Sequence, residues 1–231
     1  MKILVSWSSG KDSAWLVHVL RSQGLAPQGL LTTINEPVQR VAMHAVRVEL
    51  LNTQAESLGL PLWTVPVPFP CSNAEYEQAL GQAVRRALQD AFTHVAFADL
   101  FLEDVRRYRE ERLAGSGLSP MFPLFGVDTA RLARTMIAAG LGARITCVDP
   151  RAVDARFAGR DFDTSLLSEL PASVDPCGER GEFHTFAYRG PMFSRPIPIE
   201  TGETIERDGF VFTDLVPARG ITTMPDAAPP I

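Results

Sequence analysis

The stretch Ile3-Leu4-Val5-Ser6-Trp7-Ser8-Ser9-Gly10-Lys11-Asp12-Ser13 decides the fold of this chain. Its first three residues are apolar and predict a short buried strand, while the apolar periodicity from Ala14 to Leu20 predicts a helix that ends before Gly24. Small polar residues, one glycine and one lysine lie between them. Such a turn is suited to an anion, because the free N–H groups at a helix start carry partial positive charge and Lys11 adds a full charge.

Two well-known phosphate-binding loops do not match this turn. The dinucleotide fingerprint needs three glycines, and the P-loop needs Ser or Thr where the chain has Asp12 and a glycine where it has Val5. An ordinary strand–helix turn without a ligand is the structural alternative. The turn instead resembles SGGxDS, the pyrophosphate-binding loop of the N-type ATP pyrophosphatases, with Ser9 in place of the usual glycine. If that position requires a positive φ, Ser9 carries backbone strain.

Composition limits the classes of function. The chain has 231 residues, enough for one large domain or two small ones, and its net charge of −5 does not favour nucleic-acid binding. No apolar run reaches the length of a membrane span, and the N-terminus does not match a signal peptide, so we expect a cytoplasmic protein that does not bind a membrane. The cysteines Cys71, Cys147 and Cys177 form no CxxC pair, which argues against a disulfide framework, a zinc site or a redox site.

Strands alternate with helices along the first half of the chain, which predicts an α/β fold with a Rossmann-like, doubly wound parallel sheet. The predicted strands are 29–34, 62–65 (bounded by Pro61 and Pro66) and 95–98. The predicted helices run from 43 to 58, from a cap at Asn73 through the apolar stripe Tyr76, Leu80, Val84 and Leu88, and from 103 to 113. We divide the chain into an ATP-binding domain, 1–120, and a smaller C-terminal α/β substrate domain, 121–231.

The second domain is predicted to contain a helix from 129 to 139, a strand at 143–148 and a hairpin around Asp208-Gly209. Residues 225–231 are expected to be loose.

Ligands of open α/β sheets bind beyond the carboxyl ends of the strands. This rule groups the Ser8–Ser13 turn with Thr32, Thr33 and Asp99 at one edge of the sheet. Asp99 could hold Mg²⁺ or orient a nucleophile, or it could cap the helix that starts at 103. His44 and Arg47 lie one helical turn apart and could reach the nucleotide or face solvent.

A second signature, residues 175–186, reads Asp-Pro-Cys-Gly-Glu-Arg-Gly-Glu-Phe-His-Thr-Phe. Glu179, Glu182 and His184 place two carboxylates and an imidazole within six residues, next to glycines that let the backbone approach a ligand. The residue types suit an amine pocket, proton transfer during amide formation, or a metal site. The structural alternative is a turn that leads into a strand.

The second signature resembles the motif of the diphthine–ammonia ligase (diphthamide synthase) family, which belongs to the adenine nucleotide alpha hydrolase-like superfamily. Phe97-Ala98-Asp99-Leu100 and Val148-Asp149-Pro150 resemble two further blocks of that family. The resemblance implies that ATP, with Mg²⁺, is cleaved between the α and β phosphates, that a substrate carboxylate becomes an acyl-adenylate, and that ammonia displaces AMP to form an amide. It also offers a homodimer as an expectation.

The candidate nucleotide-binding residues are Ser6, Ser8, Ser9, Gly10, Lys11, Asp12, Ser13, Thr32 and His44. The candidate catalytic residues are Lys11, Asp99, Glu179, Glu182 and His184, and no set of metal ligands is identified. Abundant Arg beside scarce Lys suggests a GC-rich, bacterial genome, in which the acceptor would not be diphthine. A non-catalytic nucleotide-binding or sensing protein is the alternative. Sulfur transfer to tRNA is disfavoured by the missing cysteine pair and the acidic charge.

Overall fold

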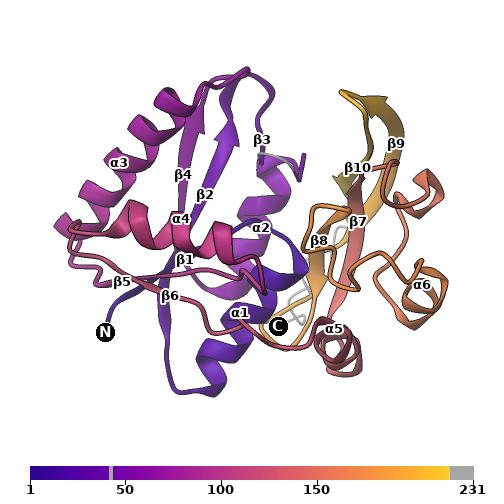
Figure 1. Ribbon diagram of the computed structural model, residues 1–231, viewed down its shortest axis with the longest axis horizontal. Coiled ribbons are helices and arrows are strands. Elements are labelled where there is room, and N and C mark those ends of the chain that lie inside the picture. The colour runs from indigo at the N-terminus through magenta and orange to yellow at the C-terminus, as the bar shows by residue number, and fades with distance from the viewer. Residues whose placement is uncertain (42–43, 219–231) are drawn as a thin grey trace, which may run out of the picture.

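A computed structural model describes residues 1–41 and 44–218, in which two sheets lie side by side (Figure 1). The first sheet contains β1 (Ile3–Ser6), β2 (Pro27–Asn35), β3 (Arg40–Val41), β4 (Leu62–Val67), β5 (His94–Ala96) and β6 (Ser119–Met121). The second contains β7 (Gly142–Val148), β8 (Phe183–Arg189), β9 (Ile199–Arg207) and β10 (Phe210–Pro217). The helices are α1 (Lys11–Ser22), α2 (Val48–Leu58), α3 (Asn73–Gln89), α4 (Glu103–Leu113), α5 (Thr129–Ala138) and α6 (Thr164–Glu169), with 3-10 turns η1 (Glu36–Val38) and η2 (Ala155–Phe157).

Five strands of the first sheet are parallel and follow the order β4-β2-β1-β5-β6, and the short β3 pairs antiparallel with the end of β2. The order reverses between β1 and β5, so the doubly wound sheet predicted from the sequence is confirmed. Strand β4 continues through Pro66, where the sequence predicted its end. An edge strand tolerates this proline, because the missing N–H costs no ladder bond on its outer side.

Helices cover both faces of this sheet, because the apolar side chains of β1 point alternately to one face and to the other. Ile3 and Val5 belong to the larger core with α1 and α2, while Leu4 points to a smaller core with Ala87 of α3 and Leu113 of α4. Successive side chains of a strand point to opposite faces, so a short apolar run can bury both. The continuous apolar run Ile3-Leu4-Val5 is therefore the sequence mark of a strand covered on both sides.

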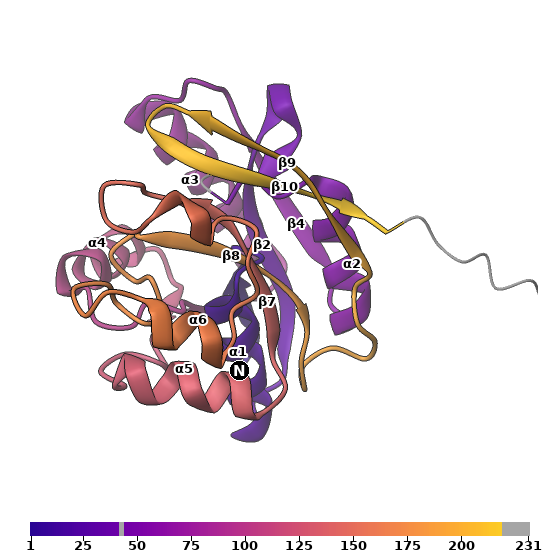
Figure 2. The same cartoon turned by 90° about the vertical axis from the view of Figure 1, so that its right-hand side faces the viewer.

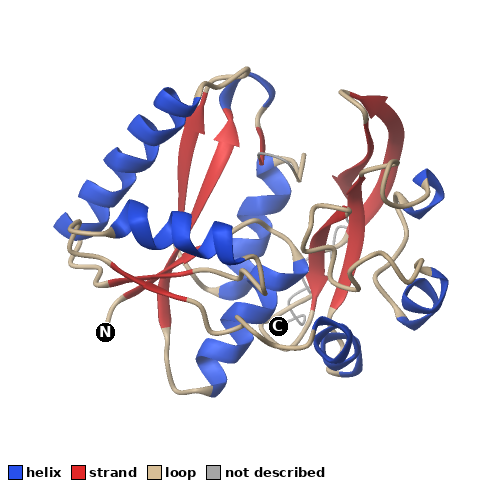
Figure 3. Cartoon of the chain, viewed as in Figure 1, coloured by secondary structure: helices blue, strands red, loops and turns tan. Residues whose placement is uncertain are grey.

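The second sheet is antiparallel, with the order β8-β7-β10-β9. Helix α6 lies on its side away from the first sheet (Figures 1 and 3). The hairpin β9–β10 turns at Asp208 and Gly209, both with positive φ, as predicted. Figure 2 shows this hairpin near α2, and Asp214 of β10 pairs there with Arg40 and Arg47 at 2.7 and 2.5 Å.

The larger core continues without a break from α1 and α2 into the second sheet, where it includes Ile145 and Phe186. The division at residue 120 remains a prediction, and the expectation for residues 225–231 lies outside the described residues. Within residues 1–41 and 44–218, no helix has the length and hydropathy needed to cross a bilayer.

Two predicted helix starts are wrong by a few residues. Helix α2 begins at Val48 and not at 43, because Ala45 has a positive φ that a helix cannot include. Met43, which the sequence placed in this helix, lies outside the described residues. Helix α3 is capped by Ser72, one residue before Asn73, in a reciprocal capping box with Glu75.

Gln54 of α2 links the turn after β1, in the first sheet, to β8 in the second sheet. Its side chain is fully buried; its Oε1 accepts a hydrogen bond from Trp7 Nε1 (3.1 Å), and its Nε2 donates to the carbonyls of Ser9 (2.9 Å) and Ala187 (2.6 Å). The Ala187 N–H also donates to the Ser9 carbonyl, at 2.9 Å. One amide thus connects the turn after β1, helix α2 and strand β8.

The substitution Gln54→Leu is expected to lower the free energy of unfolding by about 2–4 kcal/mol, because it leaves the Trp7 N–H and two carbonyls with fewer partners inside the core. Urea denaturation of the purified protein measures this change. Asn52→Leu, at an exposed position of the same helix, is the control and should change stability by less than about 0.5 kcal/mol. Equal effects of the two substitutions would contradict the role given to Gln54.

Candidate functional site

A cavity of about 730 Å³ opens at the carboxyl ends of the parallel strands, where the sequence predicted a ligand site. Of the candidate residues, Ser6, Ser8, Thr32, His44 and His184 line it. The rest of its wall comes mainly from the sheet, α3 and α4: Leu31, Thr33, Tyr76, Glu77, Leu80, Val84, Val95, Phe97, Tyr108, Arg109, Arg112 and Leu113. The cavity wall does not include the other candidates, which are Ser9, Gly10, Lys11, Asp12, Ser13, Asp99, Glu179 and Glu182.

Most of the apolar stripe predicted for α3 lines the cavity, although Val84 also packs against the smaller core and Leu88 is exposed. Tyr76, Leu80 and Val84 are only half-buried and line the cavity, while the buried positions of this helix are Ala83 and Ala87. Sequence periodicity identifies an apolar face but not what covers it. Sequence analysis therefore did not identify the α3 residues as part of the cavity wall.

The turn between β1 and α1 is strained at Ser9, whose φ is +68°. The Ser9 hydroxyl is buried without a hydrogen-bond partner among the described residues. Gly10 follows as the N-cap of α1, and a Cβ on it would lie 3.0 Å from His44 Cε1 and 3.2 Å from the Thr185 carbonyl. The glycine is thus needed for close approach to β8, whereas the left-handed position is the preceding serine.

The Lys11 side chain points away from the cavity and toward the second signature. It is 2% exposed, and its Nζ donates to Asp12 Oδ2 (2.8 Å) and to the Cys177 carbonyl. The rings of Phe162 and Phe183 lie 5.3 and 5.5 Å from the ammonium. Burial opposes its charge, but the carboxylate of Asp12 and the neighbouring groups outweigh burial and raise the pKa of Lys11, so the lysine stays protonated.

Glu182 holds the backbone of the second signature. It is 5% exposed, and its two oxygens accept hydrogen bonds from the N–H groups of Asp175 and Arg180, both at 2.9 Å. Asp175 supports the same loop by accepting from the N–H groups of Cys177 and Glu179. These contacts give Glu182 a positioning role in this conformation, with neither oxygen free of the loop.

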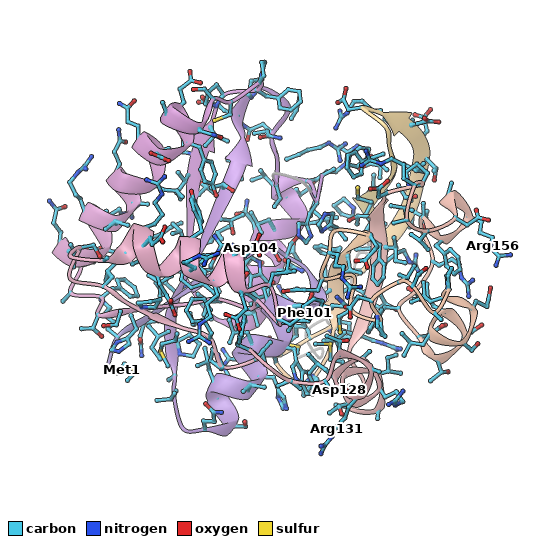
Figure 4. The ribbon with its side chains drawn as sticks, viewed as in Figure 1. Met1, Phe101, Asp104, Asp128, Arg131 and Arg156 are labelled. Atoms are coloured by element: carbon cyan, nitrogen blue, oxygen red, sulfur yellow. The ribbon has the colours of Figure 1, made fainter. Side chains whose placement is uncertain are left out.

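Glu179 links the second signature to the first sheet. Its Oε1 accepts a hydrogen bond from the Leu100 N–H at 2.7 Å, and the guanidinium of Arg180 lies 5.3 Å from the ring of Phe101, the next residue. Figure 4 shows Phe101 between the two sheets. Burial raises the pKa of Glu179 to about 7, with the negative charges of Asp12 and Asp99 acting in the same direction. A carboxyl group with this pKa exchanges protons near neutral pH.

Asp99 follows β5, and its Oδ2 lies 3.4 Å from Arg109 Nε, a long ion pair beside the cavity. It does not cap α4, because the N-cap of that helix is Leu102, without a side-chain cap. The capping alternative for Asp99 is therefore wrong. Arg47 contacts Asp214 and does not line the cavity.

His44 and His184 face each other on the cavity wall, with ring centroids 4.7 Å apart. His44 Nδ1 lies 3.1 Å from the Thr185 carbonyl, which can only accept, so this nitrogen carries the proton. Burial lowers the pKa of His44 to about 4. Burial is the main cause that lowers the pKa of His184 to about 3, and the positive charge of Lys11 acts in the same direction. Both rings are therefore neutral at neutral pH.

A magnesium ion has one candidate ligand in the turn. The described residues contain no group of three His, Cys, Asp or Glu side chains that could hold a metal, but the Asp12 Oδ1 is buried without a hydrogen-bond partner. Magnesium in nucleotide sites is commonly held by one or two carboxylates, substrate phosphates and water. The Asp12 carboxylate fits such an ion.

Sequence reasoning also missed Gln54, which holds the turn. A signal for it exists in the sequence: a polar amide lies among Leu50, Leu51, Ala55 and Leu58 on the apolar face of a helix. Such a residue is expected to have a specific buried partner.

Ser9→Gly is expected to stabilise the protein by about 1 kcal/mol, because relief of the left-handed strain and removal of an unpartnered hydroxyl exceed the added freedom of the unfolded chain. Ser9→Ala removes the hydroxyl but keeps the strain, so the difference between the two variants measures the relieved strain minus the added freedom of glycine in the unfolded chain. Thermal and urea unfolding supply both values. A glycine variant that is less stable than the alanine variant would contradict the strain at Ser9.

Glu179→Gln tests the raised pKa through stability. The folded pKa of Glu179, about 7, exceeds its unfolded value, so ionisation disfavours the folded state as pH rises through this range. The glutamine retains an acceptor for Leu100 and cannot ionise. The variant should therefore gain about 1–3 kcal/mol relative to the wild type between pH 5 and pH 8.5, measured by urea unfolding. A constant difference, or one of opposite slope, would contradict the raised pKa.

Comparison with known proteins places the chain in a family. A family model named diphthamide synthase N-terminal domain matches residues 1–107, and one named diphthamide synthase C-terminal domain matches residues 128–214. A diphthine–ammonia ligase of Danio rerio is 24% identical over 89% of this chain and 89% of its own length. A diphthine–ammonia ligase of Bos taurus is 26% identical over 75% of this chain and 69% of its own length.

A solved structure described as a predicted subunit of a tRNA methyltransferase from Methanocaldococcus jannaschii is similar at 17% identity, with a TM-score of 0.43 over 63% of this chain and 80% of that one. The two family models together include both signatures and most strands of both sheets, with β6 between the two matched ranges. The chain belongs to the diphthamide synthase family.

Proposed function

We propose that this protein is an ATP-dependent ligase that activates a carboxylate as an acyl-adenylate, releases pyrophosphate, and joins the acyl group to ammonia. The observation that carries the proposal is the meeting of the two signatures. The turn between β1 and α1 lies against β8 and is held there by two hydrogen bonds. The Ala187 N–H donates to the Ser9 carbonyl (2.9 Å), and the Lys11 N–H donates to Thr185 Oγ1 (3.1 Å). Relatives named diphthine–ammonia ligase support the same reaction class.

The cavity suggests the orientation of the nucleotide. The phosphates are placed at the end lined by Ser6 and Ser8, next to the start of α1, where backbone N–H groups and the helix dipole favour negative charge. The base is placed in the apolar part of the cavity, against Leu80, Val84 and Phe97. This orientation leaves the α-phosphorus near the middle of the cavity, open to attack.

Lys11 acts in this proposal by charge and by position. Its ammonium lies in the turn and binds the Cys177 carbonyl, so it fixes the second signature against the phosphate end and adds positive potential there. Magnesium, held by Asp12 and the phosphates, would neutralise charge on the departing pyrophosphate. Glu179 is the group whose pKa, raised by burial to about 7, suits it to take up a proton near neutral pH.

The acceptor is proposed to be a carboxylate other than diphthine, on the ground that the scarcity of Lys beside abundant Arg suggests a bacterial source. The alternative function is a non-catalytic nucleotide-binding or sensing protein, which would bind ATP or AMP without turnover. The two differ in one product, since only the ligase releases pyrophosphate.

Lys11→Ala is expected to lower pyrophosphate release by at least about a hundredfold, since it removes a buried charge from the turn that orients the phosphates. The measurement is a pyrophosphate-release screen over candidate carboxylates with ammonium, with AMP assayed in parallel. Lys2→Ala, which removes the only other lysine of the chain, is the control and should keep full activity. ADP and phosphate as products would refute the reaction type, and tight ATP binding without any pyrophosphate would favour the sensing protein.

A further inference from the structure

We propose that His44 and His184 together bind the uncharged nitrogen nucleophile, ammonia or a small primary amine, before it attacks the activated carboxylate. The inference rests on the proposed function and specifies it, because it gives the nitrogen substrate a site of its own. It also replaces the expectation that His44 contacts the nucleotide.

The two rings come from segments that lie far apart in the sequence, and both line the same cavity. His44 lies in the segment before α2, and His184 lies in β8, with an angle of 42° between the ring planes. Thr185, the neighbour of His184, holds the His44 ring through its carbonyl. The packing of β8 against the segment before α2 therefore brings the pair together.

The proton arrangement selects the type of ligand. Because His44 Nδ1 donates to a carbonyl, the Nε2 of the neutral ring has a lone pair and can only accept a hydrogen bond. Across residues 1–41 and 44–218, neither this Nε2 nor a ring nitrogen of His184 is hydrogen-bonded to protein. Phosphate and carboxylate oxygens are acceptors and gain nothing at this Nε2, whereas a ligand with N–H groups does.

Charge selects the uncharged form of the ligand. Burial keeps both rings neutral and lowers their pKa values to about 4 and about 3. Lys11 is the charged side chain that acts on both rings, and it is a cation. Ammonium would add a second cation near Lys11, so the pair favours ammonia.

The step balances as a simple acyl transfer. The nitrogen lone pair forms a bond to the acyl carbon, the bond from that carbon to the AMP oxygen breaks, and the electron pair leaves with AMP. The nitrogen loses one proton, which passes to solvent. The histidines hold and orient the nucleophile through its other N–H bonds.

Binding can be tested without knowing the carboxylate, because the chain has four histidines that NMR can distinguish: His18, His44, His94 and His184. Protein labelled with ¹⁵N-histidine and loaded with a non-hydrolysable ATP analogue is titrated at pH 8.5 with ammonium chloride, and in parallel with potassium chloride. We expect saturable shifts of the His44 and His184 ring nitrogens with ammonium only, and their loss from His184 in His44→Phe. Unshifted rings, or equal shifts with potassium, would overturn the proposal.

Kinetics test the same site once the screen has supplied a carboxylate. His44→Phe and His184→Phe should each raise the KM for ammonia about tenfold, the effect of one lost hydrogen bond, while the KM for ATP and carboxylate-dependent ATP–pyrophosphate exchange change less than about twofold. His18→Phe in α1 is the matched control. A rise in the KM for ATP would assign the pair to the nucleotide and overturn the inference. Failure of the wild type to release pyrophosphate would refute the proposed function instead.

Discussion

The turn between β1 and α1 depends on partners that lie far away in the sequence. Its Ser9 carbonyl accepts hydrogen bonds from Gln54 of α2 and from Ala187 of β8, and its Lys11 ammonium is bound to the Cys177 carbonyl. A serine in the left-handed region costs free energy, so its conformation persists only where surrounding contacts fix it. Contacts from the second sheet are therefore needed to hold the turn between β1 and α1 in its conformation.

This constraint explains why the polar residues of the second signature divide into two groups. Both oxygens of Glu182 and the Oδ1 of Asp175 accept from backbone N–H groups of the loop and fix its shape, and the Oδ2 of Asp175 accepts from the Thr129 hydroxyl. Thr185 binds both the Lys11 N–H and the His44 ring. Glu179 keeps one carboxyl oxygen, and His184 its ring nitrogens, without a hydrogen bond to the described residues. Burial raises the pKa of Glu179 and lowers the pKa of His184. Burial favours the neutral form of both groups, so Glu179 can act as an acid and the His184 ring can accept a hydrogen bond near neutral pH.

The cavity shows that part of the apolar face of a helix can line a ligand-sized space while the rest of that face packs against the sheet. Leu80 and Val84 of α3 have the spacing of a core stripe, yet they line an open space large enough for a ligand. The buried contacts of α3 are made by Ala83 and Ala87, whose small side chains let the helix approach the sheet next to that space. An apolar face in a sequence therefore identifies a buried surface or a ligand surface, and the distinction depends on what lies opposite.

The sequence by itself determined the parallel sheet, the position of the turn at Ser8–Ser13, the charged helix 103–113 and the second signature, because each depends on local periodicity, turn chemistry or a contiguous motif. The sequence also indicated that Ser9 would be strained if its position required a positive φ. Only the tertiary structure decided the direction of the Lys11 side chain, the buried role of Gln54, the start of α2 at Val48 and the pairing of His44 with His184. These depend on contacts between residues more than a hundred positions apart, or on a backbone conformation such as that of Ala45, and neither has a periodic signal in the chain.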